Sequence, residues 1–232
     1  MRKRYFVYVF CLIAIFLLWK FFALATEGRN VTVTESAQVR DTLAPGVERK
    51  ILTVYFSQGD NAELPEGVDA SSSASIAYWK GELTGNAGVI ARMIHERVGG
   101  EIFPILTKKK YPSSFSGVIP VGLAEKVANA RPELSVHVAN MQDYNTIFLV
   151  YPAWWYKMPM SLYSFLDEYD LSGKVVYVCV SSESSGFTNE IAAIRKLEPN
   201  ATVVRGIAVR TAQTMEAGGA VNQWLDEVMA RW

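Results

Sequence analysis

The sequence predicts an α/β domain built around a mostly parallel sheet that helices cover on both faces. Three observations lead to this fold class. Five short apolar runs alternate with segments of helical pattern between residues 51 and 232. The central runs are apolar on both faces, as a sheet buried on both sides requires. Half of the 232 residues are apolar, which suits one good-sized domain with right-handed strand–helix–strand crossovers.

The first half of this domain is expected to hold two strands and two helices. The run ILTVYF at 51–56 is a buried strand, and residues 86–100 have apolar positions at helical spacing before a Gly-Gly stop. A second strand follows at 101–106, where Pro104 indicates a sheet edge because proline cannot donate to the ladder. Residues 121–130 have a helical pattern that Pro132 stops.

The second half continues the alternation with three more strands. They are expected at 145–151, 174–181 and 201–209. Helices are expected at 159–170, with Pro159 in the first turn, at 188–197 and at 215–232.

The first 25 residues differ in character from the rest of the chain. MRKR precedes an apolar stretch from Tyr5 to Ala25 that only Lys20 interrupts. This pattern predicts a transmembrane anchor or signal peptide over residues 1–25, with the domain on the extracytoplasmic side, or secreted if the chain is cleaved after Ala25. A buried N-terminal helix is the remaining alternative. The polar residues 26–49 are expected to be a linker, and residues 50–232 the folded domain.

Charge and cysteine content narrow the functional class. Four of the 23 basic residues lie in the first 25 positions, which leaves 19 basic against 23 acidic residues in the remainder. With no basic stripe, nucleic acid is not the expected partner. Cys11 and Cys179 offer no disulfide framework within the domain, and no metal-ligand pattern or Ser-His-Asp order is present.

Ligands of open α/β sheets bind beyond the carboxyl ends of the strands. Three segments with small polar or aromatic residues stand at such ends, SQGDNAE after the first strand, YPAWWYK after the third and SSESSGF after the fourth. Their coincidence at one sheet edge predicts a binding site there.

These residues carry a resemblance to the flavodoxin-like family. The chain is similar to the branch with YFSxxG at the end of the first strand, GNT before the first helix and YPxWW after the third strand. Here the motifs are YFSQGD from Tyr55, GNA from Gly85 and YPAWW from Tyr151. Over residues 50–230 the resemblance implies a three-layer sandwich, with a five-stranded parallel sheet in the order 2-1-3-4-5 and a bound FMN.

The resemblance also implies which residues hold the cofactor. They are Ser57, Gln58, Gly59, Gly85, Asn86, Ala87, Pro152, Ala153, Trp154, Trp155, Ser185 and Gly186.

The first of these groups has the chemistry of a phosphate site. Ser57 offers a hydroxyl, Gly59 lets the backbone turn, and Asn86 stands where an N-cap belongs, so that N–H groups of the following helix face an anion. The family usually has threonine where this chain has Ala87, which removes one hydroxyl ligand. A tight strand–helix turn without a ligand remains the alternative.

The aromatic loop has the character of a flavin wall. Trp155 is expected to lie against the flavin ring and Trp154 to pack inward. The family usually has glycine where this chain has Tyr156, and Lys157 could stabilise an anionic reduced flavin electrostatically. The alternative is a core cap with a partner surface.

The sequence is therefore consistent with two functions. The first is an FMN-binding redox domain that exchanges electrons with a partner protein or reduces a quinone-like acceptor. The second is a non-catalytic binding or scaffold domain that keeps the fold and has lost the flavin through the changes at Ala87 and Tyr156.

Overall fold

The computed structural model describes residues 43–44, 46–62, 76–183 and 186–232. The predicted leader at 1–25 lies outside the described residues, as does most of the predicted linker at 26–49. None of the helices in the described ranges has the length and apolar character needed to cross a membrane.

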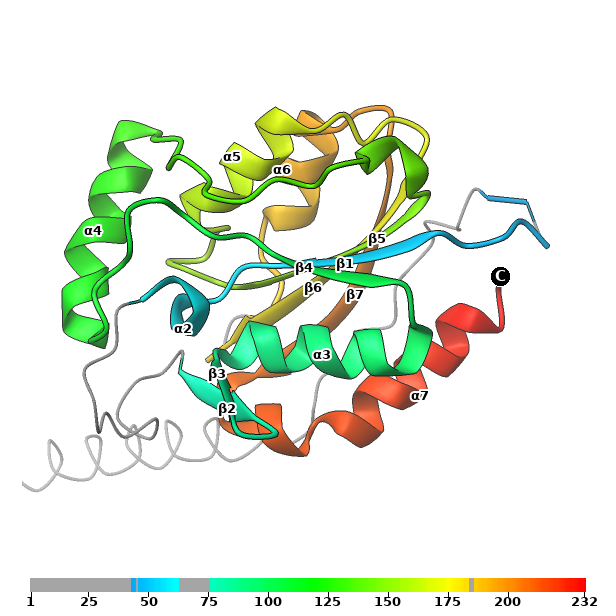
Figure 1. Ribbon diagram of the computed structural model, residues 1–232, viewed down its shortest axis with the longest axis horizontal. Coiled ribbons are helices and arrows are strands. Elements are labelled where there is room, and N and C mark those ends of the chain that lie inside the picture. The colour runs from blue at the N-terminus through cyan, green and yellow to red at the C-terminus, as the bar shows by residue number, and fades with distance from the viewer. Residues whose placement is uncertain (1–42, 45, 63–75, 184–185) are drawn as a thin grey trace, which may run out of the picture. The chain divides into compact units, whose positions relative to one another are not determined.

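Five parallel strands form the central sheet, in the order β4-β1-β5-β6-β7 (Figure 1). In chain order they are β1 (Ile51–Tyr55), β4 (Glu101–Pro104), β5 (Thr146–Pro152), β6 (Val175–Ser182) and β7 (Thr202–Arg210). This is the predicted order 2-1-3-4-5, and it confirms the predicted fold class. Pro104 lies in β4, the edge strand on one side, where a missing N–H breaks no ladder.

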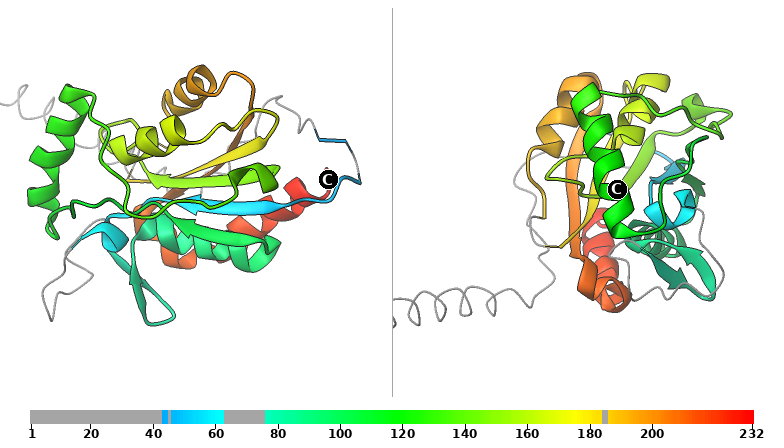
Figure 2. Two further views of the ribbon diagram at one scale, coloured as in Figure 1. Left: turned by 45° about the horizontal axis from the view of Figure 1, so that its top comes forward. Right: turned by 90° about the vertical axis from the view of Figure 1, so that its left-hand side faces the viewer.

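Helices cover both faces of the sheet. Those on one face are α3 (Asn86–Val98) and α7 (Gly218–Met229), and those on the other are α5 (Met160–Glu168) and α6 (Glu190–Leu197) (Figures 1 and 2). Two short 3-10 turns, η2 (Met141–Asp143) and η3 (Thr211–Glu216), precede β5 and α7.

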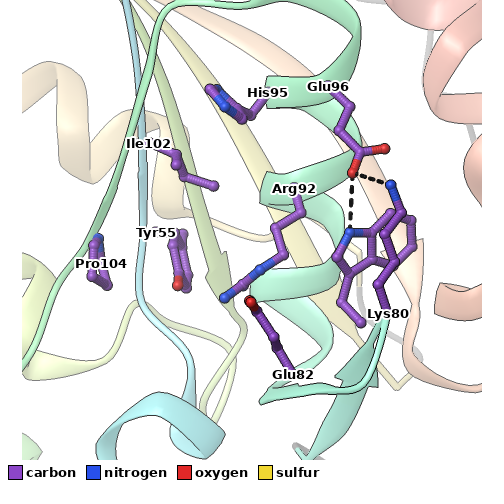
Figure 3. Close-up of a pocket in the computed structure, with 9 residues that line it drawn as sticks. Tyr55, Lys80, Glu82, Arg92, His95, Glu96, Ile102 and Pro104 are labelled. Carbon is purple, nitrogen blue, oxygen red and sulfur yellow. Dashed lines mark hydrogen bonds and ion pairs between the residues drawn. The ribbon is translucent and has the colours of Figure 1, made fainter.

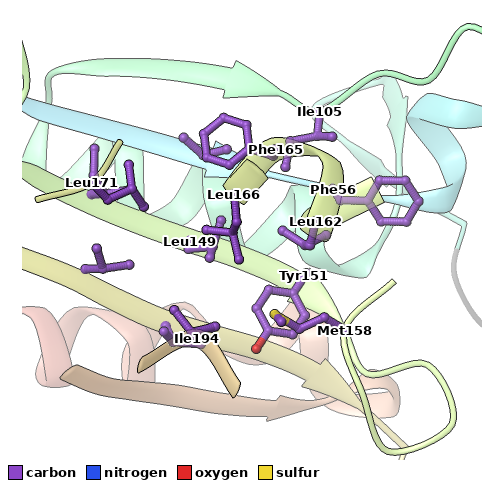
Figure 4. Close-up of a cluster of buried hydrophobic side chains, with 14 of the residues drawn as sticks. Phe56, Ile105, Leu149, Tyr151, Met158, Leu162, Phe165, Leu166, Leu171 and Ile194 are labelled. Atoms are coloured by element: carbon purple, nitrogen blue, oxygen red, sulfur yellow. The ribbon is translucent and has the colours of Figure 1, made fainter. Parts of the chain in front are cut away.

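The hydrophobic core on the α5–α6 face follows from strand alternation. Leu149 and Tyr151 of β5 point to the same face because they are two residues apart, and both are fully buried. Figure 4 shows Leu162 and Phe165 of α5 packed over this face. On the other face Phe148 contacts Trp224 of α7. Cys179 is buried there, and burial raises the pKa of its thiol to about 12.

One helix begins earlier than its sequence pattern indicated. We expected residues 121–130, but α4 (Phe115–Ala128) starts six residues sooner and contains Pro120. Ser114 caps it by accepting a hydrogen bond from the Gly117 N–H at 3.1 Å. The carbonyl of Ser116, which Pro120 cannot bond, belongs to an exposed residue, so the loss of this hydrogen bond costs little.

Two small elements near the first strand were not predicted. A four-residue helix, α2 (Gln58–Asn61), follows β1, and a hairpin of β2 (Ala77–Trp79) and β3 (Glu82–Thr84) precedes α3. Lys80 and Gly81 form its two-residue turn with φ of 50° and 88°. Such a turn at Lys-Gly between short apolar segments was a usable sequence signal. Helices α2 and α4 lie beyond the carboxyl ends of the strands (Figures 1 and 2).

Candidate functional site

The two halves of the predicted phosphate site lie side by side. Ser57 is the N-cap of α2, and its hydroxyl oxygen accepts a hydrogen bond from the Asp60 N–H at 3.3 Å. Gly59 packs directly on the residues before α3, because a Cβ there would lie 1.8 Å from the Thr84 carbonyl oxygen. The fold therefore brings Ser57–Gly59 to the start of α3 across the long insert between them.

Helix α3 begins at Asn86, the residue predicted to be its cap. Gly85 is the N-cap, with an extended φ of −131°, and Asn86 is the first helical residue. The prediction that Asn86 caps the helix is therefore wrong by one position. The first-turn N–H groups, which include those of Ala87 and Gly88, have no partner within the helix, so this end of α3 favours an anion.

Asp60 is the centre of this region, and sequence reasoning missed it. Its Oδ2 accepts hydrogen bonds from the Ser57 hydroxyl and, at 2.6 Å, from the Thr84 hydroxyl. Its Oδ1 accepts from the Tyr55 hydroxyl at 3.0 Å. Burial, with a further contribution from Asp60, raises the pKa of Tyr55 well above its usual value, so the phenol stays protonated and donates. The Ser57 hydroxyl, which was expected to bind a phosphate, is therefore already hydrogen-bonded to the Asp60 carboxylate.

Arg92 of α3 balances part of this charge. Its Nη2 lies 3.9 Å from Asp60 Oδ1, and its guanidinium carbon lies 5.3 Å from the centroid of the Tyr55 ring. A cavity of about 350 Å³ opens beside it, lined by residues that include Tyr55, Glu82 and His95. Figure 3 shows Arg92 extending from α3 between Tyr55 and Glu82. A cation nearly two turns into the helix that follows a phosphate motif was one sequence signal for this arrangement.

Two further side chains fix α2 in place. Asn61 is fully buried and uses all four of its hydrogen-bonding positions. Gln58 is also fully buried and donates through Nε2 to the Pro112 carbonyl at 3.0 Å. Neither contact depends on a ligand, so Ser57 and Asp60 are held by the protein itself.

The aromatic loop after β5 is a tight two-residue hairpin turn. Trp154 and Lys157 exchange both backbone hydrogen bonds, at 2.9 and 3.0 Å. Between them Trp155 and Tyr156 have φ of 49° and 62°. This is the geometry of a type I′ turn, which normally uses asparagine and glycine. The loop therefore holds two large aromatic residues in a backbone conformation that disfavours them.

The two tryptophans have the different environments that were predicted. Trp154 is 9% exposed and makes edge-to-face contacts with Phe56 and Tyr111, at centroid distances of 5.4 and 5.3 Å. Trp155 is partly exposed, and its ring edge lies against Gly122 of α4, where a Cβ would be 2.5 Å away. That Trp155 stacks on a flavin stays a prediction.

Contacts on both sides hold the aromatic loop. Lys126 Nζ of α4 donates to the Trp155 carbonyl at 3.1 Å. From the loop after β6, the Thr188 hydroxyl donates to the Tyr156 carbonyl at 2.7 Å. At the start of the loop Pro152 ends β5, and the N–H of Ala153 donates to the Ser181 carbonyl at 2.8 Å.

The loop after β6 is described on either side of Ser185, which lies outside the described residues. The Gly186 N–H donates to the Ser182 hydroxyl at 2.8 Å, and Gly186 has φ of 55°. Together with the Thr188 contact, this places Gly186 in the loop that faces Trp155 and Tyr156. All three predicted loops therefore meet at the carboxyl edge of the sheet.

Tyr156→Gly is expected to stabilise the protein. Glycine adopts φ of 62° without the steric cost of a side chain, and Tyr156 is 67% exposed, so little packing is lost. We expect the free energy of unfolding to rise by roughly 0.5–1 kcal/mol, measured by chemical denaturation. The matched control is Tyr78→Gly in β2, where an exposed tyrosine has ordinary strand geometry and the same change should destabilise. A loss of stability in Tyr156→Gly would contradict the inference that the backbone is strained at Tyr156.

Comparison of the sequence with known protein families supports the fold described above. A family model for flavodoxin matches residues 120–228, which include the aromatic loop and the last three strands of the sheet. The chain is flavodoxin-like.

Solved structures share the fold of this flavodoxin-like chain. A "putative flavoprotein" from Bacteroides eggerthii has 22% identity and a TM-score of 0.59, and the match covers 78% of this chain and 99% of that one. A similarly described protein from Bacteroides uniformis has 21% identity and a TM-score of 0.56, with 77% and 98% covered. A Lactobacillus acidophilus flavoprotein in complex with FMN has 12% identity and a TM-score of 0.51, with 74% and 99% covered. No curated protein sequence matches the chain.

Proposed function

We propose that this flavodoxin-like chain binds FMN non-covalently and takes part in electron transfer. The observation that carries the proposal is the meeting of the Ser57–Gly59 turn, the start of α3 and the Trp154–Trp155 hairpin at one sheet edge. The Lactobacillus acidophilus protein of the same fold holds FMN, which adds support. Bound FMN supplies one- and two-electron chemistry, and the protein supplies position and electrostatics.

The residues of the site fit the two ends of FMN unequally. At the ring end, Trp155 offers a partly exposed aromatic side chain on a loop fixed from both sides. Lys157 follows it and, as an exposed cation, would favour an anionic reduced ring. At the phosphate end the first turn of α3 offers N–H groups, but the Ser57 hydroxyl is bonded to Asp60. The ring end would therefore supply the larger share of affinity.

Exposed apolar side chains around the same edge favour a protein as the electron partner over a quinone-like molecule. Phe115, Leu123 and Val127 of α4 are 52%, 38% and 87% exposed, and Tyr156 is 67% exposed. Large apolar side chains gathered near a site are typical of protein contact surfaces. A quinone-like acceptor is the alternative.

The second candidate function is a binding domain without flavin. Two observations favour it, namely the engagement of Ser57 by Asp60 and the presence of Ala87 in place of threonine. Such a domain would use the exposed side chains of α4 and Tyr156 to contact its ligand. It differs from the first function in a single measurable property, which is flavin affinity.

We also propose that the domain lies on the extracytoplasmic side of a membrane. The support is the basic start and the long apolar stretch up to Ala25. Anchoring and cleavage after Ala25 predict different masses for the mature protein, which intact mass spectrometry of the membrane and soluble fractions distinguishes.

The test of FMN binding is a titration of the full chain, purified in mild detergent, followed by quenching of flavin fluorescence. We expect saturable binding, and a loss of affinity of about tenfold in Trp155→Ala, since one aromatic stack contributes on the order of 1 kcal/mol beyond burial. Trp232→Ala is the matched control, because the Trp232 carbonyl accepts from the Gly46 N–H before β1, away from the carboxyl edge of the sheet. This variant should bind FMN as the unmodified chain does. A chain that ignores excess FMN would refute the redox function and favour the binding domain.

A further inference from the structure

We propose that Asp60 is an internal anion that competes with the phosphate of FMN for the Ser57 and Thr84 hydroxyls. Asp60 would thereby set how strongly the site prefers FMN over riboflavin, which lacks the phosphate. The inference rests on the proposed function, because it concerns the phosphate end of the same flavin site.

The hydroxyl protons at the phosphate end are already used within the protein. Each hydroxyl has one proton to donate, and those of Ser57 and Thr84 are both directed to Asp60 Oδ2. The Tyr55 hydroxyl is directed to Oδ1. A phosphate can accept from the Ser57 and Thr84 hydroxyls only when Asp60 releases them.

The space inside the turn is also filled by protein atoms. Gly59 and Gly88 would leave room for a ligand in a phosphate-binding turn, but here that room holds Thr84. A Cβ on Gly88 would lie 1.9 Å from Thr84 Oγ1, and a Cβ on Gly59 would lie 1.8 Å from the Thr84 carbonyl oxygen. The side chain of Asp60 is 13% exposed. The carboxylate is therefore part of a packed arrangement that fills the turn.

Two positively charged side chains also lie beside Asp60. Arg92 lies 3.9 Å from the Asp60 carboxylate and also donates to Thr84 Oγ1 at 3.0 Å and to the Gly88 carbonyl at 3.2 Å. Lys110 Nζ donates to the backbone carbonyl of Asp60 at 3.2 Å. These cations face the negative charge of the Asp60 carboxylate, and an incoming phosphate is repelled by it. When the carboxylate is removed, as in Asp60→Asn, the same cations are available to the phosphate.

The test compares two flavins on two proteins. The dissociation constants of FMN and riboflavin are measured by fluorescence quenching for the full chain and for Asp60→Asn. We expect Asp60→Asn to tighten FMN binding at least about tenfold, equivalent to about 1.4 kcal/mol, and to change riboflavin binding by less than about twofold. Asp226→Asn is the matched control, because it removes one negative charge from the exposed ion pair between Asp226 of α7 and Arg97 of α3. It should change neither constant.

Each outcome decides the inference. If the unmodified chain binds FMN and Asp60→Asn binds it equally or more weakly, Asp60 is not a competitor, while FMN binding itself stands. If neither protein binds either flavin, both the inference and the proposed function are wrong. If only Asp60→Asn binds FMN, the inference holds in its strongest form. Asp60→Ser, checked for folding by circular dichroism, should shift FMN binding in the same direction and guards against a folding defect in Asp60→Asn.

Discussion

Asn61→Leu is expected to lower the free energy of unfolding by about 3–5 kcal/mol, the largest effect of any single substitution considered for this chain. Asn61 Nδ2 donates to the carbonyls of Ser57 and Ile105, both at 2.9 Å. Its Oδ1 accepts from the N–H and the hydroxyl of Thr107, at 2.7 and 3.1 Å. Both Asn61 and Thr107 are buried, so water cannot replace these partners in the variant.

Chemical denaturation of the full chain measures this loss. Asn145→Ala is the matched control, because Asn145 also joins separate backbone segments but lies where solvent reaches it. It accepts from the Lys50 N–H at 3.1 Å and donates to the Glu48 carbonyl at 2.9 Å. We expect the control to lose less than about 1.5 kcal/mol. Equal losses in the two variants would show that burial of the Asn61 hydrogen bonds does not increase their contribution to the free energy of unfolding.

Gly59→Ala is expected to destabilise the protein by about 3 kcal/mol and to weaken FMN binding at least about tenfold. The reason is steric. The added Cβ would lie 1.8 Å from the carbonyl oxygen of Thr84 and 2.3 Å from its carbonyl carbon, and backbone atoms cannot rotate away as a side chain can. Helix α2 must therefore move away from the start of α3, which separates Ser57 from Gly85.

Thermal denaturation and FMN titration of the same preparation test both parts of this prediction. For a domain of this size, about 3 kcal/mol corresponds to a fall in Tm of about 6–12 °C. Gly218→Ala at the start of α7 is the control, since a Cβ there would meet no atom within 4 Å. Its stability should stay unchanged or rise by up to about 1 kcal/mol, because alanine favours helix. A Gly59→Ala variant as stable as the control would show that α2 does not pack on Thr84.

The alternation of apolar runs and helical segments determined the sheet. The strands at 51–56, 145–151, 174–181 and 201–209 are found within one or two residues of their expected ends. These segments are buried on both faces, so almost every residue had to be apolar, and this leaves a clear pattern. The start of α4 was predicted wrongly because Pro120, a breaker in sequence terms, occupies a solvent-facing position where its cost is small.

The sequence by itself also determined which segments meet at the binding edge, because the carboxyl ends of parallel strands share one edge. It did not determine what each side chain does there. Tertiary structure decided that the Thr84 hydroxyl and Arg92 join Ser57 at the Asp60 carboxylate, since they reach it only when the β2–β3 hairpin and α3 pack against α2. It likewise decided that Trp154 is buried and Trp155 is partly exposed, because Trp155 stands at the corner of the turn while Trp154 precedes it and packs on Phe56. The strands leave a local periodic pattern, whereas the Thr84–Asp60 and Trp154–Phe56 contacts join residues more than 20 positions apart and leave no periodic trace in the sequence.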